Sequence, residues 1–353
     1  MKEANQVGPA AQLEFLGKLQ RILNEGLFVA SYKYALIMSI AELCVEEDPR
    51  PDGTLHLSLY DIAERFITLY WRQALPFRGG IYINHSTGTD PAAISSIRDF
   101  QQRVSSLAAA QRRADWRQLV RRVATVIKGM PLKRLQLVGK ERLTFLYGEE
   151  PTKDETGRYV IALRPGVAKS FRDQFPVVQA LVQVAWLTFI QRLPANQQLL
   201  GTNDLADFLF GSDRVSLATL VPGLTEVQHG RCFYCQRPLD ERPNVDHFIS
   251  WSRYQVDFGH NFVLAHGSCN MDKRDMLAAP VHLGRWSERN LNDAESLRQI
   301  FEEARFVYDL DASQSVVEWQ YETAERTGAL VWLSKRGRTS KLPENWRSYM
   351  ATT

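Results

Sequence analysis

This sequence contains few cysteines and no long hydrophobic run. Four cysteines in 353 residues are far too few for the disulfide framework of a small secreted protein. The longest apolar stretch, 177–190, contains two glutamines and is shorter than the roughly 20 apolar residues that a membrane-spanning helix needs. The N-terminal residues lack the apolar segment of a signal peptide. These absences predict a cytoplasmic chain without a membrane partner.

Charge of one sign is not in excess either. The 43 Lys and Arg residues nearly balance the 40 Asp and Glu residues, for a net charge of +3, so overall charge alone predicts no nucleic-acid partner. The hydrophobic fraction of 44% and the charged fraction of 24% are typical of an ordinary globular protein and argue against disorder. At about 100–200 residues per domain, the length predicts two domains.

Apolar residues recur at helical spacing through most of the first 210 residues. The segments with this spacing are 11–25, 31–47, 58–73, 91–108, 115–128 and about 167–191. Two strands, 143–149 and 158–165, are predicted to form a hairpin because a polar loop joins them. We therefore predict a helical N-terminal domain over residues 1–210.

The second part, 211–353, has a different character. Its core, 231–277, holds three of the four cysteines, three histidines and two short β-like runs. Two helices, about 290–306 and 312–326, and a basic tail follow. The predicted fold class is thus mostly α with small β elements.

Two pairs of metal-ligating side chains lie 30 residues apart in this core. Cys232 and Cys235 form a CxxC pair, and His266 and Cys269 form an HxxC pair. Two ligands three positions apart on a tight turn can reach one ion, and two such pairs supply a tetrahedral zinc site. The alternative is a reduced CxxC beside an unrelated His and Cys, but two half-sites at this separation rarely coincide by chance. The spacing predicts a structural Zn²⁺.

A second chemical set lies between and beside these pairs. Asp246 and His247 end a predicted strand, and Asn270 directly follows Cys269. The side-chain oxygens of Asp246 and Asn270 suit a hard divalent cation such as Mg²⁺. His247 can act as general base for an attacking water, because imidazole titrates near neutral pH.

The order of these motifs along residues 231–277 resembles that of the HNH endonuclease family, whose nuclease module is a zinc-containing ββα-metal fold. The residues that match, in chain order, are Cys232, Cys235, Asp246, His247, Asn261, His266, Cys269, Asn270 and Lys273. The resemblance covers about 50 of 353 residues. Three positions depart from the commonest pattern: His266 replaces Cys, Ser250 replaces Pro and Asn270 replaces the final His. None of these departures removes a catalytic group.

The resemblance implies hydrolysis of a DNA phosphodiester bond with one catalytic Mg²⁺ or Mn²⁺. In the family's scheme, Asp246 and Asn270 bind this metal and His247 activates the water. Asn261 holds the loop that carries His247, and Lys273 steadies phosphate charge.

Backbone affinity for DNA has to come from outside this module, because residues 226–280 contain six basic and seven acidic residues. Residues 112–142 are the best candidate, with ten basic and two acidic residues. Their cations recur along one helix face, and the predicted DNA contacts are Arg113, Arg117, Arg121 and Lys128. A solvated basic face without a ligand is the alternative. The basic tail at 335–347 is a second, weaker candidate for DNA contact. Residues 57–73 resemble the helices of a helix-turn-helix domain, but an amphipathic helix in an ordinary core explains their pattern equally well.

The sequence therefore predicts a divalent-metal-dependent DNA endonuclease. A large partner domain fused to such a module resembles nucleases of bacterial restriction and anti-phage systems, so a partner protein of a defence complex is also expected, by analogy. Three alternatives stay open. The chain could be a zinc-containing nucleic-acid-binding or scaffold protein without cleavage, a nuclease directed at RNA, or one subunit that is inactive alone.

Overall fold

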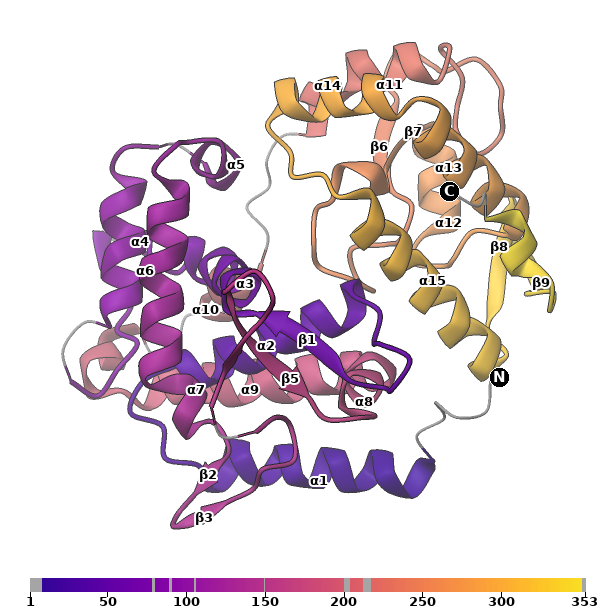
Figure 1. Cartoon of the computed structure of the whole chain (residues 1–353). Coiled ribbons are helices and arrows are strands. Elements are labelled where there is room, and N and C mark those ends of the chain that lie inside the picture. The colour runs from indigo at the N-terminus through magenta and orange to yellow at the C-terminus, as the bar shows by residue number, and fades with distance from the viewer. Residues whose placement is uncertain are drawn as a thin grey trace. The chain divides into compact units, whose positions relative to one another are not determined.

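The computed structural model describes residues 8–77, 80–88, 91–104, 106–148, 150–199, 204–211 and 217–350. The chain divides into two compact units, Met1–Asp213 and Arg214–Thr353, here called unit 1 and unit 2 (Figure 1). Both consist of helices with small antiparallel sheets, which confirms the predicted fold class. Among the described residues, no helix has both the length and the apolar composition needed to cross a bilayer.

Unit 1 is mainly helical. Its α-helices are α1 (Pro9–Glu25), α2 (Tyr32–Glu46), α3 (Leu59–Trp71), α4 (Ala92–Gln101), α5 (Leu107–Gln111), α6 (Trp116–Gly129), α7 (Pro131–Arg134), α8 (Val167–Asp173), α9 (Phe175–Arg192) and α10 (Leu205–Phe210), and a 3-10 helix, η2, spans Pro194–Leu199. The predicted helix at 91–108 is two helices, α4 and α5. The predicted helix at 167–191 breaks at Gln174, because the ring of Pro176 cannot continue a helix from α8.

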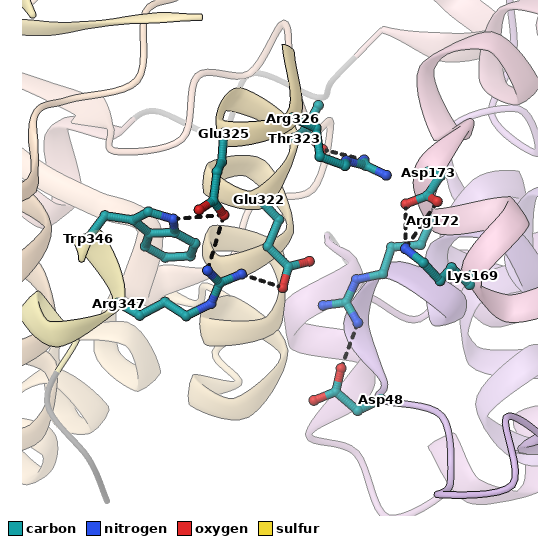
Figure 2. A network of polar contacts seen from close by, with 10 residues as sticks. All are labelled: Asp48, Lys169, Arg172, Asp173, Glu322, Thr323, Glu325, Arg326, Trp346 and Arg347. Atoms are coloured by element: carbon teal, nitrogen blue, oxygen red, sulfur yellow. Dashed lines mark hydrogen bonds and ion pairs between the residues drawn. The ribbon is translucent and has the colours of Figure 1, made fainter. Parts of the chain in front are cut away.

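The core of unit 1 forms around α2, which packs against α3, α8 and α9. Leu36, Ile37 and Met38 are successive residues that point about 100° apart around α2, yet all three are buried. A helix that is apolar on every side is expected to be enclosed by others. Ion pairs between Arg172 and Asp48 and between Lys169 and Asp173 add polar links at α8 (Figure 2).

A three-stranded antiparallel sheet completes unit 1, in the order β1 (Leu55–Ser58), β5 (Tyr159–Leu163), β4 (Thr152–Lys153). A separate hairpin joins β2 (Leu137–Val138) and β3 (Glu141–Arg142). Among the described residues, the pairing predicted between 143–149 and 158–165 is present only as an antiparallel bridge between Tyr147 and Leu163, and β4 forms the first strand of the hairpin instead. The Asp154 carboxylate accepts hydrogen bonds from the backbone N–H groups of Thr156 and Arg158, so the turn is tighter than predicted and β4 pairs with β5.

Unit 2 contains the predicted order of strand, loop, strand and helix. Its strands are β6 (Asn244–His247), β7 (Phe262–Ala265), β8 (Leu330–Ser334) and β9 (Arg338–Lys341). Its helices are α11 (Val221–Val227), α12 (Gly267–Lys273), α13 (Pro280–Asn292), α14 (Ala294–Ala304) and α15 (Leu310–Thr327), with the 3-10 helices η3 (Leu217–Leu220), η4 (Gly259–Asn261) and η5 (Trp346–Tyr349). The strands β6 and β7 pair antiparallel, with α11 against β7 and α12 against β6 (Figure 1).

The C-terminal part of unit 2 differs from its prediction in two respects. The two expected helices are present as α14 and α15, but α13 precedes them. The basic tail is an ordered hairpin, β8–β9, followed by η5. Arg347 in η5 forms ion pairs with Glu322 and Glu325 of α15, and the Trp346 indole donates to Glu325 (Figure 2). These contacts fasten the end of the chain to α15.

Candidate metal centre and active site

Cys232, Cys235, His266 and Cys269 form a cluster that can hold a metal ion such as zinc. One ligand atom from each residue lies within 4.8 Å of all the others. His266 Nδ1 is 3.3 Å from the Cys235 sulfur and 4.0 Å from the Cys269 sulfur. Ligands about 2.0–2.3 Å from a tetrahedral zinc ion have separations of this order. We call these four residues the Cys₃His cluster.

The backbone around each pair turns its two ligands toward the same point. Cys232 and Cys235 lie on a tight turn in which the Gln236 N–H donates to the Cys232 carbonyl, and Gln236 has a left-handed φ of 60°. His266 precedes the first turn of α12, where the Cys269 N–H donates to the His266 carbonyl. The turn at Cys232–Cys235 and the N-terminal end of α12 thus present two ligands each.

A hydrogen bond outside the cluster orients its imidazole. His266 Nε2 lies 2.8 Å from the Pro238 carbonyl oxygen, which requires a proton on Nε2 and leaves the Nδ1 lone pair facing the sulfurs. Such second contacts fix the tautomer of metal-ligating histidines.

Burial, neighbouring thiols and hydrogen bonds shift the pKa values of two cysteines of the cluster in opposite directions. Burial, followed by the neighbouring Cys232 and Cys235, raises the pKa of Cys269 to about 12. Burial also acts to raise the pKa of Cys235, but hydrogen bonds, first from the Arg237 backbone, outweigh it and lower the pKa to about 7. A divalent cation at the centre would relieve the repulsion among thiolates.

Asp246 lies beside this cluster, buried in a network of donors. The Tyr234 hydroxyl donates to its Oδ2 at 2.6 Å, and Lys273 Nζ lies 3.2 Å from the same oxygen. Burial and the Asp246 carboxylate hold the pKa of Tyr234 well above its ordinary value, so its hydroxyl stays a donor. Tyr234 is part of the turn between Cys232 and Cys235, so this turn of the Cys₃His cluster and the Asp246 carboxylate are directly linked.

Lys273 is fully buried on α12, and its ammonium group also donates to the His247 carbonyl at 3.0 Å. These contacts make Lys273 a link between α12 and the end of β6. They differ from the exposed, phosphate-facing position that the family resemblance implies, because both interactions point into the protein.

His247, at the end of β6, pairs with a residue that the sequence did not single out. Its Nε2 lies 2.7 Å from Asp257 Oδ1, and its ring lies 4.9 Å from the Phe262 ring. If Nε2–H donates to Asp257, Nδ1 is the free acceptor. The two residues lie ten positions apart in sequence, so no short motif could reveal the contact.

Asn261 holds the chain that follows His247. Its Oδ1 accepts from the Ile249 N–H at 2.7 Å and its Nδ2 donates to the Ile249 carbonyl at 2.9 Å. This two-point contact is the one that the family resemblance implies. Asn270 is half-buried on α12, and no side-chain hydrogen bond to it is found within the described residues, so its amide oxygen is available to a ligand.

Two arginines of α13 donate hydrogen bonds to backbone carbonyls around the site, and no sequence motif indicated either of them. Arg285 donates to the carbonyls of Phe233 and Tyr234 in the metal-binding turn. Arg289 is buried and donates to the carbonyls of Phe262 and His260 at the start of β7. Helix α13, outside the ββα unit, therefore contacts both the turn between Cys232 and Cys235 and the start of β7.

Three of the four basic residues predicted to contact DNA, Arg117, Arg121 and Lys128, lie on α6 in unit 1, and Arg113 lies just before this helix. Trp116, Val120, Val123 and Ile127 are buried, as the helical periodicity predicts. Arg117 and Arg121 are exposed and form no ion pair among the described residues. Arg113 pairs with Asp115, and Lys128 Nζ lies 3.3 Å from the Tyr159 ring centroid. Two of the four predicted cations are therefore already engaged.

Comparison with known proteins places part of the chain in a family. No curated protein and no solved structure shows significant similarity to the chain. The family model that matches is described as a domain of unknown function, DUF8808, and it covers residues 12–209. These residues fall in unit 1, so the Cys₃His cluster and its neighbours lie outside the match. Because the match spans more than half of the chain, this protein belongs to the DUF8808 family.

Proposed function

We propose that the protein is a DNA endonuclease of the HNH type, which hydrolyses phosphodiester bonds with one divalent metal ion. The observation that carries the proposal is the β6–β7–α12 unit. It carries Asp246 and His247 at the end of β6 and Asn270 on α12, and the Cys₃His cluster takes its ligands from before β6 and from the start of α12. In this proposal the cluster holds structural Zn²⁺, and its free thiols fit a reducing cytoplasm.

The catalytic ion would be Mg²⁺ or Mn²⁺, bound by the oxygens of Asp246 and Asn270. Both donors to Asp246 contact Oδ2, and we assign Oδ1 to the metal. Carboxylate and amide oxygens are suitable ligands for hard cations, and a site with few protein ligands leaves room for phosphate and water. When bound, the ion supplies Lewis-acid stabilisation of the phosphoryl and leaving oxygens.

His247 is the proposed general base. A water attacks the phosphorus, its proton passes to the free imidazole nitrogen, and the bond from phosphorus to the leaving sugar oxygen breaks. Asp257 holds the ring through Nε2 and stabilises the imidazolium that forms, as the third member of a catalytic triad does. Asn261 fixes the backbone after His247, and Lys273 and Tyr234 fix Asp246.

A non-catalytic zinc scaffold is the second candidate. It would need the Cys₃His cluster but not the His247–Asp257 pair, which lies outside the cluster and makes no contribution to metal binding there. A partly buried His–Asp pair next to a buried carboxylate fits the general base and its orienting partner in a catalytic site better than it fits a scaffold. The placement of DUF8808 beside the module fits, by analogy alone, a defence nuclease whose partner protein or trigger acts through unit 1.

The proposal is tested by cleavage of supercoiled plasmid in Mg²⁺ or Mn²⁺, with His247→Ala as the key variant. Metal-dependent nicking that His247→Ala abolishes, at unchanged zinc content, is the expected result. His229→Asn is a matched control, since His229 is exposed and has a left-handed φ of 52° that asparagine tolerates. Cleavage by His247→Ala at the rate of the intact protein would refute the assignment of His247 as general base. Cleavage of RNA but not of DNA would show that the substrate is RNA.

A further inference from the structure

The proposed nuclease module, residues 226–280, has no net positive charge, because its six basic residues are outnumbered by seven acidic ones, yet a strongly basic element is attached to it. Residues 330–341, the hairpin β8–β9, contain four cations and no acidic residue. The cations are Lys335, Arg336, Arg338 and Lys341, and all four are exposed.

The hairpin is fixed to α12, the helix that carries Asn270. The Asp272 carboxylate accepts from the Trp332 indole N–H at 2.8 Å and from the Gly337 backbone N–H at 3.2 Å. Lys335 Nζ donates to the Ser268 hydroxyl at 2.7 Å. Ser268 and Asp272 lie on either side of Asn270 in α12, so the hairpin is held to the helix both before and after it.

The base of the hairpin is fixed as firmly as its tip. The Trp332 N–H donates to the Leu277 carbonyl, and the Trp332 carbonyl accepts from the Ala279 N–H, each at 2.7 Å. The buried Trp332 ring packs edge-to-face on Tyr234, 5.2 Å between ring centroids. Tyr234 is the donor to Asp246, so one continuous set of contacts joins the hairpin to the proposed metal ligand.

The cations of the hairpin are available to a ligand. Within the part of unit 2 that the structure describes, Arg336, Arg338 and Lys341 form no ion pair, and the recorded side-chain bond of Lys335 is to a neutral hydroxyl. By contrast, Arg298 and Arg347 in the same unit are each held by two glutamates.

The turn is built to project these side chains. Arg336 has a φ of 72° and Gly337 a φ of 63°, and both lie in the three-residue turn between the paired residues Ser334 and Arg338. Arginine seldom adopts this backbone conformation, and the exposed cations Lys335, Arg336 and Arg338 lie within four residues at this turn.

We propose that the β8–β9 hairpin is a DNA-binding arm whose four cations contact backbone phosphates next to the scissile bond. This inference rests on the proposed nuclease function for the identity of its ligand. It accounts for how a module with net negative charge gains affinity for a polyanion, since each cation that neutralises a phosphate releases condensed counterions. The attachment to α12 sets the bound backbone beside Asn270.

The test measures binding of a fluorescent DNA duplex by anisotropy between about 50 and 200 mM salt, in Mg²⁺-free buffer. All proteins carry His247→Ala, which prevents cleavage during the measurement. Arg336→Gln/Arg338→Gln is compared with Arg305→Gln/Arg326→Gln, which removes two exposed cations elsewhere on unit 2. The hairpin pair is expected to weaken binding roughly tenfold and to reduce the salt slope by roughly 1.8, about 0.9 per phosphate contact.

The inference fails if the hairpin pair and the control pair change the affinity equally, or if the parent does not bind the duplex. Lys335→Gln/Lys341→Gln repeats the test at other positions, so a folding defect of one variant does not decide it. Tighter, hairpin-dependent binding of an RNA duplex would overturn the assignment to DNA. Failure of the nuclease proposal is separate, because it is read from plasmid cleavage by chains with an intact His247 and an intact hairpin.

Discussion

The Cys₃His cluster and the proposed catalytic site share α12 but are built in different ways. The cluster supplies four soft ligands within 4.8 Å of one another and leaves no open position for a substrate. The proposed catalytic site supplies Asp246 and Asn270 alone, and its shape depends on Tyr234, Lys273 and Asp257 around them. A metal site with all its ligand positions filled by protein stabilises the fold. A site with open ligand positions depends on neighbouring side chains to hold its geometry while those positions stay free for substrate.

The largest effect is expected at the closed site. Cys232→Ser removes a buried sulfur ligand, so bound zinc should fall to a small fraction and unit 2 should unfold at a lower temperature, because structural zinc contributes folding free energy directly. Metal content and thermal unfolding measure both. Cys44→Ser, which changes a buried thiol of α2 outside the cluster, should keep its zinc. Equal zinc in both variants would remove Cys232 from the ligand set.

At the open site, Asp257→Asn should have the next largest effect. The amide cannot stabilise the imidazolium or select the tautomer of His247, so the cleavage rate should fall about 100-fold while zinc content stays unchanged. Nitrogen chemical shifts of the imidazole report the tautomer independently of activity. Asp240→Asn, an exposed acid of the same module, is the control. Unchanged chemical shifts and rate would show that the pair has no positioning role.

Tyr234→Phe tests the link between the two sites. Loss of the hydroxyl frees Asp246 from one donor, so the Mg²⁺ concentration for half-maximal cleavage should rise several-fold, and stability should fall by about 1 kcal/mol. Tyr321→Phe loses a similarly buried hydroxyl bond, to the Ala278 carbonyl, and should lower stability without changing the metal dependence. The same Mg²⁺ dependence in both variants would contradict the proposal that Tyr234 links the Cys₃His cluster to the metal ligand Asp246.

The smallest effect is expected in unit 1. Reversal of Arg117 and Arg121 to Glu should weaken DNA binding and flatten its salt dependence, since both are exposed and unpaired among the described residues. The hairpin variants provide the comparison under identical salt conditions. A salt slope that only the hairpin variants change would confine the DNA path to unit 2.

The sequence predicted the parts of the site that depend on short spacings. The four cluster ligands lie three positions apart in pairs, and Asp246 and His247 are adjacent, so local geometry brings them together. Asp257 could not be predicted, because its contact with His247 depends on the path of a ten-residue loop. The burial of Lys273 also escaped prediction, since its helix position alone does not reveal that Tyr234 and Asp246 cover it.

The fold shows the same division. Helical periodicity predicted α1, α2, α3 and α6 closely, because each has a regular apolar pattern. The basic tail concealed the hairpin β8–β9, because its stability comes from tertiary contacts of Trp332 and Asp272. α13 was also missed as a separate helix. Its buried His282 and Arg289 give a polar pattern that only their backbone partners explain.

The most direct test of the central claim is plasmid cleavage by the intact protein and by His247→Ala, each with Mg²⁺ and with the metal withheld. The account predicts nicking that requires both the metal and His247, while zinc content is equal in the two proteins. Cleavage that persists in His247→Ala, or no cleavage of DNA by the zinc-loaded protein under any metal, would contradict it.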